Sequence, residues 1–248
     1  GVLEDHGEHP EARAGLRLVL RNRRRSASHR TPTTSAGAIW LGEQALPVKF
    51  DVDTRTLRYE EEEARSALSA SLGLESSGEQ ESPSIFSKRD VPEAMSLDLV
   101  VLGASGGQTA REHLLKTRGA GRATHFLVDW DGQIYQTLDL ALRAHHVADE
   151  ALDQRSVSIT LVNPMTKDAP PLPASASGSS HVRPLSAPAA VHGELIQAWG
   201  YTASQERSLA RLLQGLLGAL PNLPRTVAMG LDVLPSDAHK GVLGQLHL

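Results

Sequence analysis

An Asp-Gly pair between two β-prone runs is the feature that most constrains the fold of this chain. Asp131-Gly132 separates residues 124–129, which read Thr-His-Phe-Leu-Val-Asp, from residues 133–137, which read Gln-Ile-Tyr-Gln-Thr. Asp-Gly suits a type I′ turn, whose twist matches that of two antiparallel strands. The sequence therefore predicts a β-hairpin here, and a lone hairpin needs further elements to bury its apolar side chains.

Strands and a helix are predicted on both sides of this hairpin. Residues 97–102 form an apolar run with one Asp and end in a Gly-rich loop, as is typical of a buried strand. Residues 109–118 begin with Thr-Ala-Arg-Glu, the spacing of a capping box, and predict a helix. Residues 156–162 alternate in polarity and predict another strand, and residues 242–248 predict a last one.

A second helix is predicted between these last two strands. Thr202-Ala-Ser-Gln205 again has capping-box spacing, and six leucines follow at offsets of 3, 4, 7, 8 and 11, which place them on one stripe of a helix. They are Leu209, Leu212, Leu213, Leu216, Leu217 and Leu220. The complete order is strand, helix, hairpin, strand, helix, strand. It predicts an α/β domain with a central mixed β-sheet flanked by helices.

The composition around this core indicates three regions. Residues 1–37 carry an arginine cluster and predict a flexible basic arm, and residues 96–248 form the α/β domain with a Pro/Ala/Ser-rich excursion at 169–190. Between them, residues 38–95 predict an extension with strands and a linker. Within it we expect short strands at 38–41 and 47–52 added to the later sheet, a helix opening at 60–63, and a Ser/Glu-rich linker at 71–87.

The charge and residue content exclude several classes of protein. With 25 Lys and Arg against 29 Asp and Glu, the net charge of −4 argues against nucleic acid as a partner. The chain has no cysteine, so disulfides, thiolate metal sites and cysteine nucleophiles are excluded. No apolar run approaches the roughly 20 residues that span a bilayer, and no signal peptide is visible at the start of the chain.

The residues of the core resemble a known family. Residues 123–141, Ala144-His-His-Val147 and residues 155–163 are similar to the zinc-dependent N-acetylmuramoyl-L-alanine amidases of type 2, whose fold is shared with peptidoglycan recognition proteins. The resemblance extends over about residues 97–248. It implies a zinc ion held by a His at the end of the first core strand, a His in the last strand and an Asp or Cys after it. It also implies a Glu in the middle strand that handles the proton of the zinc-bound water.

This sequence departs from that pattern at the positions that carry the chemistry. Gly103 stands at the first His, Thr160 at the Glu, and either Gln245 or Leu231 at the second His. We prefer Gln245, which would place the segment of the third ligand beyond Leu248. Glycine offers no ligand atom, threonine is no carboxylate base near neutral pH, and an amide is a poor zinc ligand. We therefore expect no zinc cofactor and no hydrolysis by the family mechanism.

Five residues near the groove implied by the resemblance are candidate ligand contacts: His125, Trp130, Tyr135, His145 and His146. A metal site rebuilt from histidines is one alternative for His125 and the His145-His146 pair. Hydrogen-bonded residues that line an inherited groove are the other. Trp130 has two interpretations, a groove-edge ring that stacks on sugars and a core-filling residue.

These observations lead to three functional hypotheses. The first is a catalytically inactive amidase-fold domain that binds peptidoglycan fragments at the cell envelope, in the periplasm or outside the cell. The second is a structural or protein-binding subunit of an envelope assembly, which the arm and the excursion favour. The third is a zinc amidase with a rearranged metal site.

Overall fold

The computed structural model describes residues 37–42, 44–59, 85–89, 97–107, 109–147, 149–164, 183–185, 189–191, 194–197, 199–228 and 239–244. Within these residues, the central sheet has five strands in the order β11-β4-β8-β5-β6. The strands are β4 (Leu99–Ala104), β5 (Phe126–Val128), β6 (Ile134–Gln136), β8 (Ser156–Leu161) and β11 (Gly241–Gly244). The first four in the order pair in parallel, and β6 is antiparallel to β5. This mixed sheet confirms the predicted fold class.

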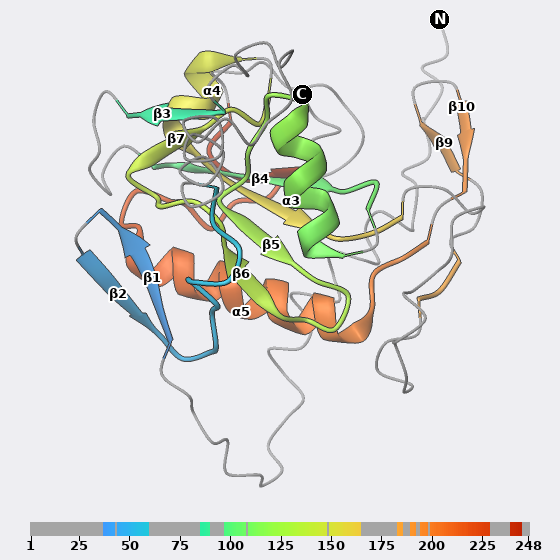
Figure 1. Cartoon of the computed structure of the whole chain (residues 1–248), viewed down its shortest axis with the longest axis horizontal. Coiled ribbons are helices and arrows are strands. Elements are labelled where there is room, and N and C mark those ends of the chain that lie inside the picture. Colours follow the sequence, from blue (N-terminus) through green and yellow to red (C-terminus); the bar gives the residue numbers. More distant parts are fainter. Residues whose placement is uncertain are drawn as a thin grey trace, which may run out of the picture.

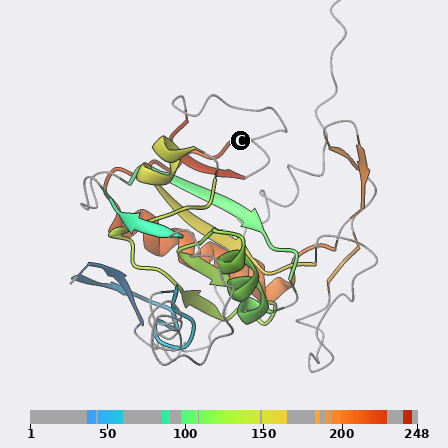
Figure 2. The same cartoon turned by 45° about the horizontal axis from the view of Figure 1, so that its top comes forward.

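Helices cover both faces of the sheet. The long helix α5 (Ala203–Ala219) lies on one face and α3 (Ala110–Gly119) on the other, as the two views in Figures 1 and 2 show. The short helix α4 (Glu150–Arg155) precedes β8. None of the described helices is long and apolar enough to cross a membrane.

Helix α5 forms as the leucine pattern predicts. Its capping box is present, with the Thr202 hydroxyl accepting from the Gln205 backbone N–H and the Gln205 side chain accepting from the Thr202 N–H. Four leucines of the stripe are buried in the main core and two are partly buried against it. The Gln205 amide also donates to the carbonyls of Val128, at 3.2 Å, and Val162, at 2.8 Å. One side chain thereby caps the helix and joins it to the sheet.

The hairpin and α3 also match their predictions. The Gly132 φ angle is +89°, and a Cβ there would lie 2.8 Å from the Ser204 carbonyl oxygen at the start of α5, so the turn requires glycine both for its backbone and for its close packing. At α3, the Thr109 hydroxyl accepts from the Glu112 N–H and begins the helix.

A hairpin forms in the extension, but its second strand lies at 44–48 instead of the predicted 47–52, and the hairpin does not join the central sheet. Strands β1 (Gly37–Leu41) and β2 (Gln44–Val48) pair only with each other among the described residues. The Gln136 side chain takes the place of a backbone ladder: its oxygen accepts from the Trp40 N–H and its nitrogen donates to the Trp40 carbonyl, both at 2.8 Å. The expectation that this hairpin extends the later sheet is therefore wrong.

Part of the predicted linker is structured. Residues 86 and 87 lie in β3 (Phe86–Lys88), which pairs with β7 (Leu142–Ala144), and the neighbouring Ile85 is only 2% exposed. The predicted linker extends too far toward the C-terminus, because an Ile-Phe pair inside a polar stretch is a weak sequence signal. The pair is nevertheless enough to anchor a short strand.

Other predictions fall largely outside the described residues. The small hairpin of β9 (Ala189–Val191) and β10 (Glu194–Ile196) begins inside the predicted excursion at 169–190. The basic arm up to residue 36, the helix at 60–63, most of the linker and excursion, Leu231 and residues 245–248 lie outside the described part.

Candidate ligand-binding site

The two faces of strand β8 differ in the side chains that they carry. Its apolar side chains pack in the core with α5, and the hydroxyl side chains that alternate with them face the α3 side of the sheet. The apolar set is Val157, Ile159 and Leu161, and the hydroxyl set is Ser156, Ser158 and Thr160. All six residues are buried, so the hydroxyl groups meet protein groups or an enclosed space instead of open solvent.

A cavity of about 120 Å³ lies on this hydroxyl side, between the sheet and α3. Gly103 of β4 and Thr160 of β8, which pair in register, both line it. Its walls include His113 and Thr117 of α3, and His146 beyond β7. Because Gly103 contributes no side chain, space remains above the middle of the sheet.

The hydroxyl groups on the sheet side of the cavity are linked to one another. Thr160 Oγ1 donates to Thr124 Oγ1 at 3.3 Å, and Thr124 Oγ1 donates to the Ser158 carbonyl at 3.2 Å. None of these groups carries a charge near neutral pH. This wall can therefore exchange hydrogen bonds with a ligand, but it offers no carboxylate base.

His113 is a cavity residue that the sequence reasoning missed. It is 8% exposed, and its buried Nδ1 has no hydrogen-bond partner among the described residues. Burial first, and then the charge of Lys116, lower the pKa of His113 to about 4, so the imidazole is neutral near pH 7. The spacing of Ala110, His113, Leu114 and Thr117 places all four on one side of α3, and this pattern could have revealed a histidine that faces inward.

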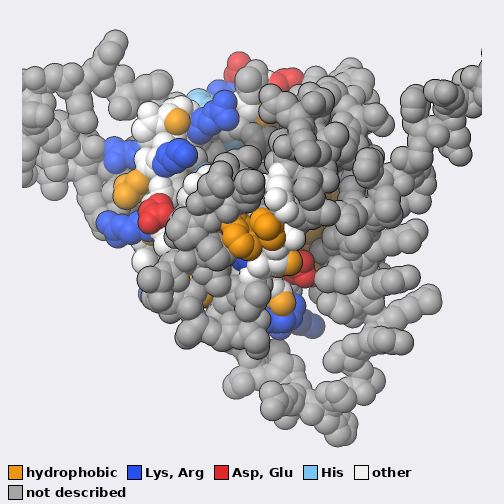
Figure 3. Space-filling model, turned by 90° about the vertical axis from the view of Figure 1, so that its right-hand side faces the viewer, with side chains coloured by type: hydrophobic (Ala, Val, Ile, Leu, Met, Phe, Trp, Pro, Cys, Tyr) orange, Lys and Arg blue, Asp and Glu red, His pale blue; other side chains and the backbone are white. Residues whose placement is uncertain are grey.

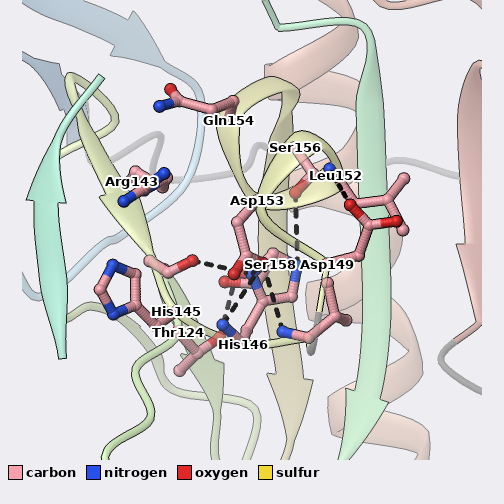
Figure 4. Close-up of polar contacts among 12 residues, drawn as sticks. Thr124, Arg143, His145, His146, Asp149, Leu152, Asp153, Gln154, Ser156 and Ser158 are labelled. Carbon is pink, nitrogen blue, oxygen red and sulfur yellow. Dashed lines mark hydrogen bonds and ion pairs between the residues drawn. The ribbon is translucent and has the colours of Figure 1, made fainter. Parts of the chain in front are cut away.

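His146 also lines the cavity and is held by contacts on both ring nitrogens. Its Nδ1 lies 2.8 Å from Asp153 Oδ1, and its Nε2 lies 3.3 Å from Ser156 Oγ. Figure 4 shows His146 and Asp153 directed toward each other, the latter from α4. Asp153 Oδ1 also accepts from the backbone N–H groups of His146 and Val147. Both ring nitrogens are thus engaged, so His146 is a fixed wall of the cavity.

His125, predicted as a ligand contact, is fully buried and does not line the cavity. Its Nδ1 accepts from the Ser158 backbone N–H at 3.1 Å, so Nε2 carries the proton and donates to the Leu142 carbonyl at 3.0 Å. Burial, and next the positive charge of Arg89, hold the pKa of His125 well below its usual value. In the structure, His125 is therefore a neutral core residue beneath the cavity and not part of its lining.

Arg89 is the buried cation beside His125, and it organises this part of the domain. Its guanidinium, 4% exposed, donates to the backbone carbonyls of Leu140 at 2.9 Å, Asp153 at 2.9 Å and Ser156 at 2.8 Å, and also to that of Gln154. Burial lowers the pKa of Arg89 to about 10, which keeps the group charged at neutral pH.

The other predicted contacts lie away from the cavity lining. Tyr135 is partly buried on β6 and packs against a second core cluster, which includes Ala110 and Leu114 of α3. His145 is partly buried, and its Nε2 lies 3.5 Å from Ser87 Oγ. Trp130 is partly buried at the hairpin turn, where its carbonyl accepts from the Thr202 hydroxyl. Of the five predicted contacts, the structure places only His146 on the cavity wall.

The described residues do not fit a zinc ion. Among them, no group of three or more His, Cys, Asp or Glu side chains is close enough to hold a metal. Gly103 and Thr160 lie side by side where the resemblance implies a His ligand and a Glu. The register of β11 against β4 ends with Gly244 opposite Leu102, and Gln245 lies outside the described residues.

A second hollow, of about 300 Å³, lies by the β5–β6 turn and α5. Its lining carries both signs of charge: Asp51 and Asp131 on one side and Arg207 and Arg211, one turn apart on α5, on the other. It contains none of the positions that align with the family's metal ligands.

Comparison with known proteins identifies the family. Residues 93–242 match the N-acetylmuramoyl-L-alanine amidase family, Amidase_2, and the chain belongs to this family. No curated protein sequence matches. Among solved structures, a crystal structure of a Se-Met AmpD derivative is 18% identical with a TM-score of 0.35, covering 65% of this chain and 78% of its own. The Ph2119 endolysin from Thermus scotoductus MAT2119 bacteriophage Ph2119 is 17% identical with a TM-score of 0.34, covering 66% and 77%.

Proposed function

We propose that this chain is a catalytically inactive member of the amidase family that binds peptidoglycan fragments at the cell envelope. The observation that carries the proposal is the Gly103–Thr160 pair in the cavity lining. These two positions hold a glycine and a hydroxyl where hydrolysis by the family mechanism needs a metal ligand and a carboxylate. A cavity lies over this pair, and a site without reactive groups can still bind.

The proposal has a direct test in co-sedimentation of the full chain with intact peptidoglycan sacculi at low and high salt. Binding through the cavity side of the domain predicts pelleting that persists at high salt, because hydrogen bonds and buried contacts are screened little. Pelleting that disappears at high salt would assign the binding to exposed arginines and contradict the proposal. Absence of pelleting at both salts would favour the second hypothesis, a subunit that binds another protein.

The inactive state is tested separately, with dye-labelled peptidoglycan and added Zn²⁺. We expect no release of dye. Release that depends on zinc and disappears in His146→Ala would overturn this part of the proposal and revive a rearranged metal site. Zinc binding by equilibrium dialysis, on the wild type and on His146→Ala, tests the rearranged metal site without an activity assay.

A further inference from the structure

We propose that the hollow beside the β5–β6 turn binds a short zwitterionic peptide. The ligand's carboxylate lies against the arginines of α5, and its ammonium lies against the two carboxylates of the other wall. Residues of α5 line this hollow, whereas residues of α3 line the cavity of the proposed function. The inference therefore concerns a second site and goes beyond the proposed function.

The hollow is lined by charges of both signs that do not pair with one another. Asp51 and Asp131 line it together with Arg207 and Arg211, and all four residues are exposed. In the described part of the chain, no ion pair joins either carboxylate to either guanidinium. On the face drawn in Figure 3, by contrast, Lys and Arg side chains gather on one part with few Asp or Glu side chains between them. A hollow with both signs is complementary to a ligand that carries both charges.

The four charged groups have hydrogen-bonding capacity that the protein does not use. Among the described residues, the Asp51 carboxylate and the Arg211 guanidinium form no hydrogen bond or ion pair. Arg207 donates to Ser204 Oγ at 3.1 Å, and Asp131 Oδ1 accepts one backbone N–H. A guanidinium has five N–H donors and a carboxylate has two acceptor oxygens. Both walls can therefore still bind an ionic group.

The turn that forms one wall is fastened to α5. The Thr202 hydroxyl donates to the Trp130 carbonyl at 2.7 Å, and the Ser208 hydroxyl donates to the Gly132 carbonyl at 2.6 Å. Asp131 lies between the two residues whose carbonyls are held in this way. Its backbone is therefore fixed relative to the arginines of α5, and a preformed site loses less conformational entropy on binding.

The second acidic residue is positioned by its neighbour Phe50. Phe50 is buried in the main core, and a Cβ at Gly215 of α5 would lie 2.9 Å from its ring. This close packing of the ring against α5 fixes the chain next to Asp51. Both carboxylates thus come from segments that are held on the helix that carries the two arginines.

The size of the hollow indicates a ligand of about two residues. A volume of about 300 Å³ corresponds to about ten water molecules at liquid density, which is close to the size of a dipeptide of small residues. In a free amino acid the ammonium and the carboxylate share one carbon, so they cannot reach opposite walls. In a dipeptide a peptide bond separates them. Arg207 and Arg211 are neighbours on the helix surface, and their N–H groups can hold the carboxylate together.

The experiment is an NMR titration of the ¹⁵N-labelled full chain with Ala-Ala and with two blocked forms of this dipeptide. Acetyl-Ala-Ala lacks the ammonium, and Ala-Ala amide lacks the carboxylate. We expect Ala-Ala to bind about fivefold more tightly than either blocked form, which is the contribution of one exposed ion pair. The shifted signals should come from residues 131–134 and 204–211. Equal affinity of the three ligands, no binding of Ala-Ala at millimolar concentration, or shifts centred on α3 would overturn the inference.

Variants connect each end of the ligand to its wall. The double variant Arg207→Gln with Arg211→Gln should remove the preference for a free carboxylate and leave the preference for a free ammonium. The double variant Asp51→Asn with Asp131→Asn should do the reverse. Arg111→Gln, exposed on α3, is the control and should leave both preferences unchanged. Because all four positions are exposed, the double variants should fold. Unchanged preferences in both double variants would refute the site.

Sedimentation with sacculi distinguishes this site from that of the proposed function. If the double variants lose dipeptide binding but pellet with sacculi as the wild type does, the two sites are separate, as inferred. If the wild type binds Ala-Ala in the hollow but does not pellet, the proposed function fails and this inference stands. If the double variants lose pelleting at high salt together with dipeptide binding, the hollow belongs to the peptidoglycan site and the inference of a second site fails.

Discussion

Replacing Arg89 by methionine should destabilise the domain strongly. Methionine occupies a similar volume but has no donor, so four backbone carbonyls, those of Leu140, Asp153, Gln154 and Ser156, lose their charged partner. Hydrogen bonds to a charged group contribute about 1.5–3 kcal/mol each. Removing the guanidinium also removes the cost of burying its charge, which is several kcal/mol. The net loss in the free energy of unfolding should therefore be about 3–5 kcal/mol.

Urea unfolding followed by circular dichroism at pH 7 measures this loss, and a thermal scan should show a Tm lower by about 10 °C. The free energy of unfolding of Arg89→Lys should lie between those of the wild type and Arg89→Met, because one ammonium group cannot reach all the carbonyls arranged around the planar guanidinium. Arg111→Met, on the exposed side of α3, is the matched control and should change the stability by less than about 0.5 kcal/mol. A loss below about 1 kcal/mol in Arg89→Met would refute the assignment of Arg89 as a buried structural cation.

Three further predictions concern the cavity histidine and the packing of the sheet. Because the pKa of His113 is lowered to about 4 in the folded chain, the unfolded chain binds a proton at this histidine at pH values where the folded chain keeps it neutral. The contribution of neutral His113 to stability should be complete above about pH 6.5 and decline toward pH 4. The urea midpoint of His113→Phe should therefore depend less on pH over this range than that of the wild type. Identical pH profiles of the two proteins would disprove the lowered pKa. Gly241→Ala should cost about 2 kcal/mol, because φ is +105° and a Cβ would lie 2.2 Å from Thr226 Oγ1; a neutral effect on the denaturation midpoint would contradict this geometry. Gln205→Leu should cost about 2–3 kcal/mol, because two buried carbonyls lose their donor, and an unchanged midpoint would show that these carbonyls find other partners.

The elements that the sequence predicts correctly carry their signal within a few residues. Asp131-Gly132 specifies its hairpin locally, and Thr202 with Gln205 and the leucines behind them specify α5 in the same way. By contrast, β3 and β7 have three residues each and form only by pairing with one another across a long stretch of chain. No local pattern marks such short strands, which explains why the predicted linker at 71–87 runs into β3.

The site was predictable only in part, for a related physical reason. Gly103, Thr160 and His146 were found through the family resemblance, and the structure brings them to one cavity. The resemblance also predicts that His125 meets a ligand, but a histidine can satisfy both nitrogens inside the protein, and this one does. Arg89 was missed because its partners are backbone carbonyls, which leave no trace in the identity of the residues that carry them.

The position of β11 has a consequence for how the protein is made. This strand pairs in parallel with β4, although more than half of the chain separates them in sequence. During synthesis, β4 emerges first, and one of its edges has no neighbour until residues 241–244 leave the ribosome. An uncovered edge of an apolar strand is a site where nascent chains associate wrongly. The nascent protein should therefore depend on chaperones until β11 emerges. Ribosome-bound chains that stop before β11 should aggregate or be cut by protease more readily than chains that include it.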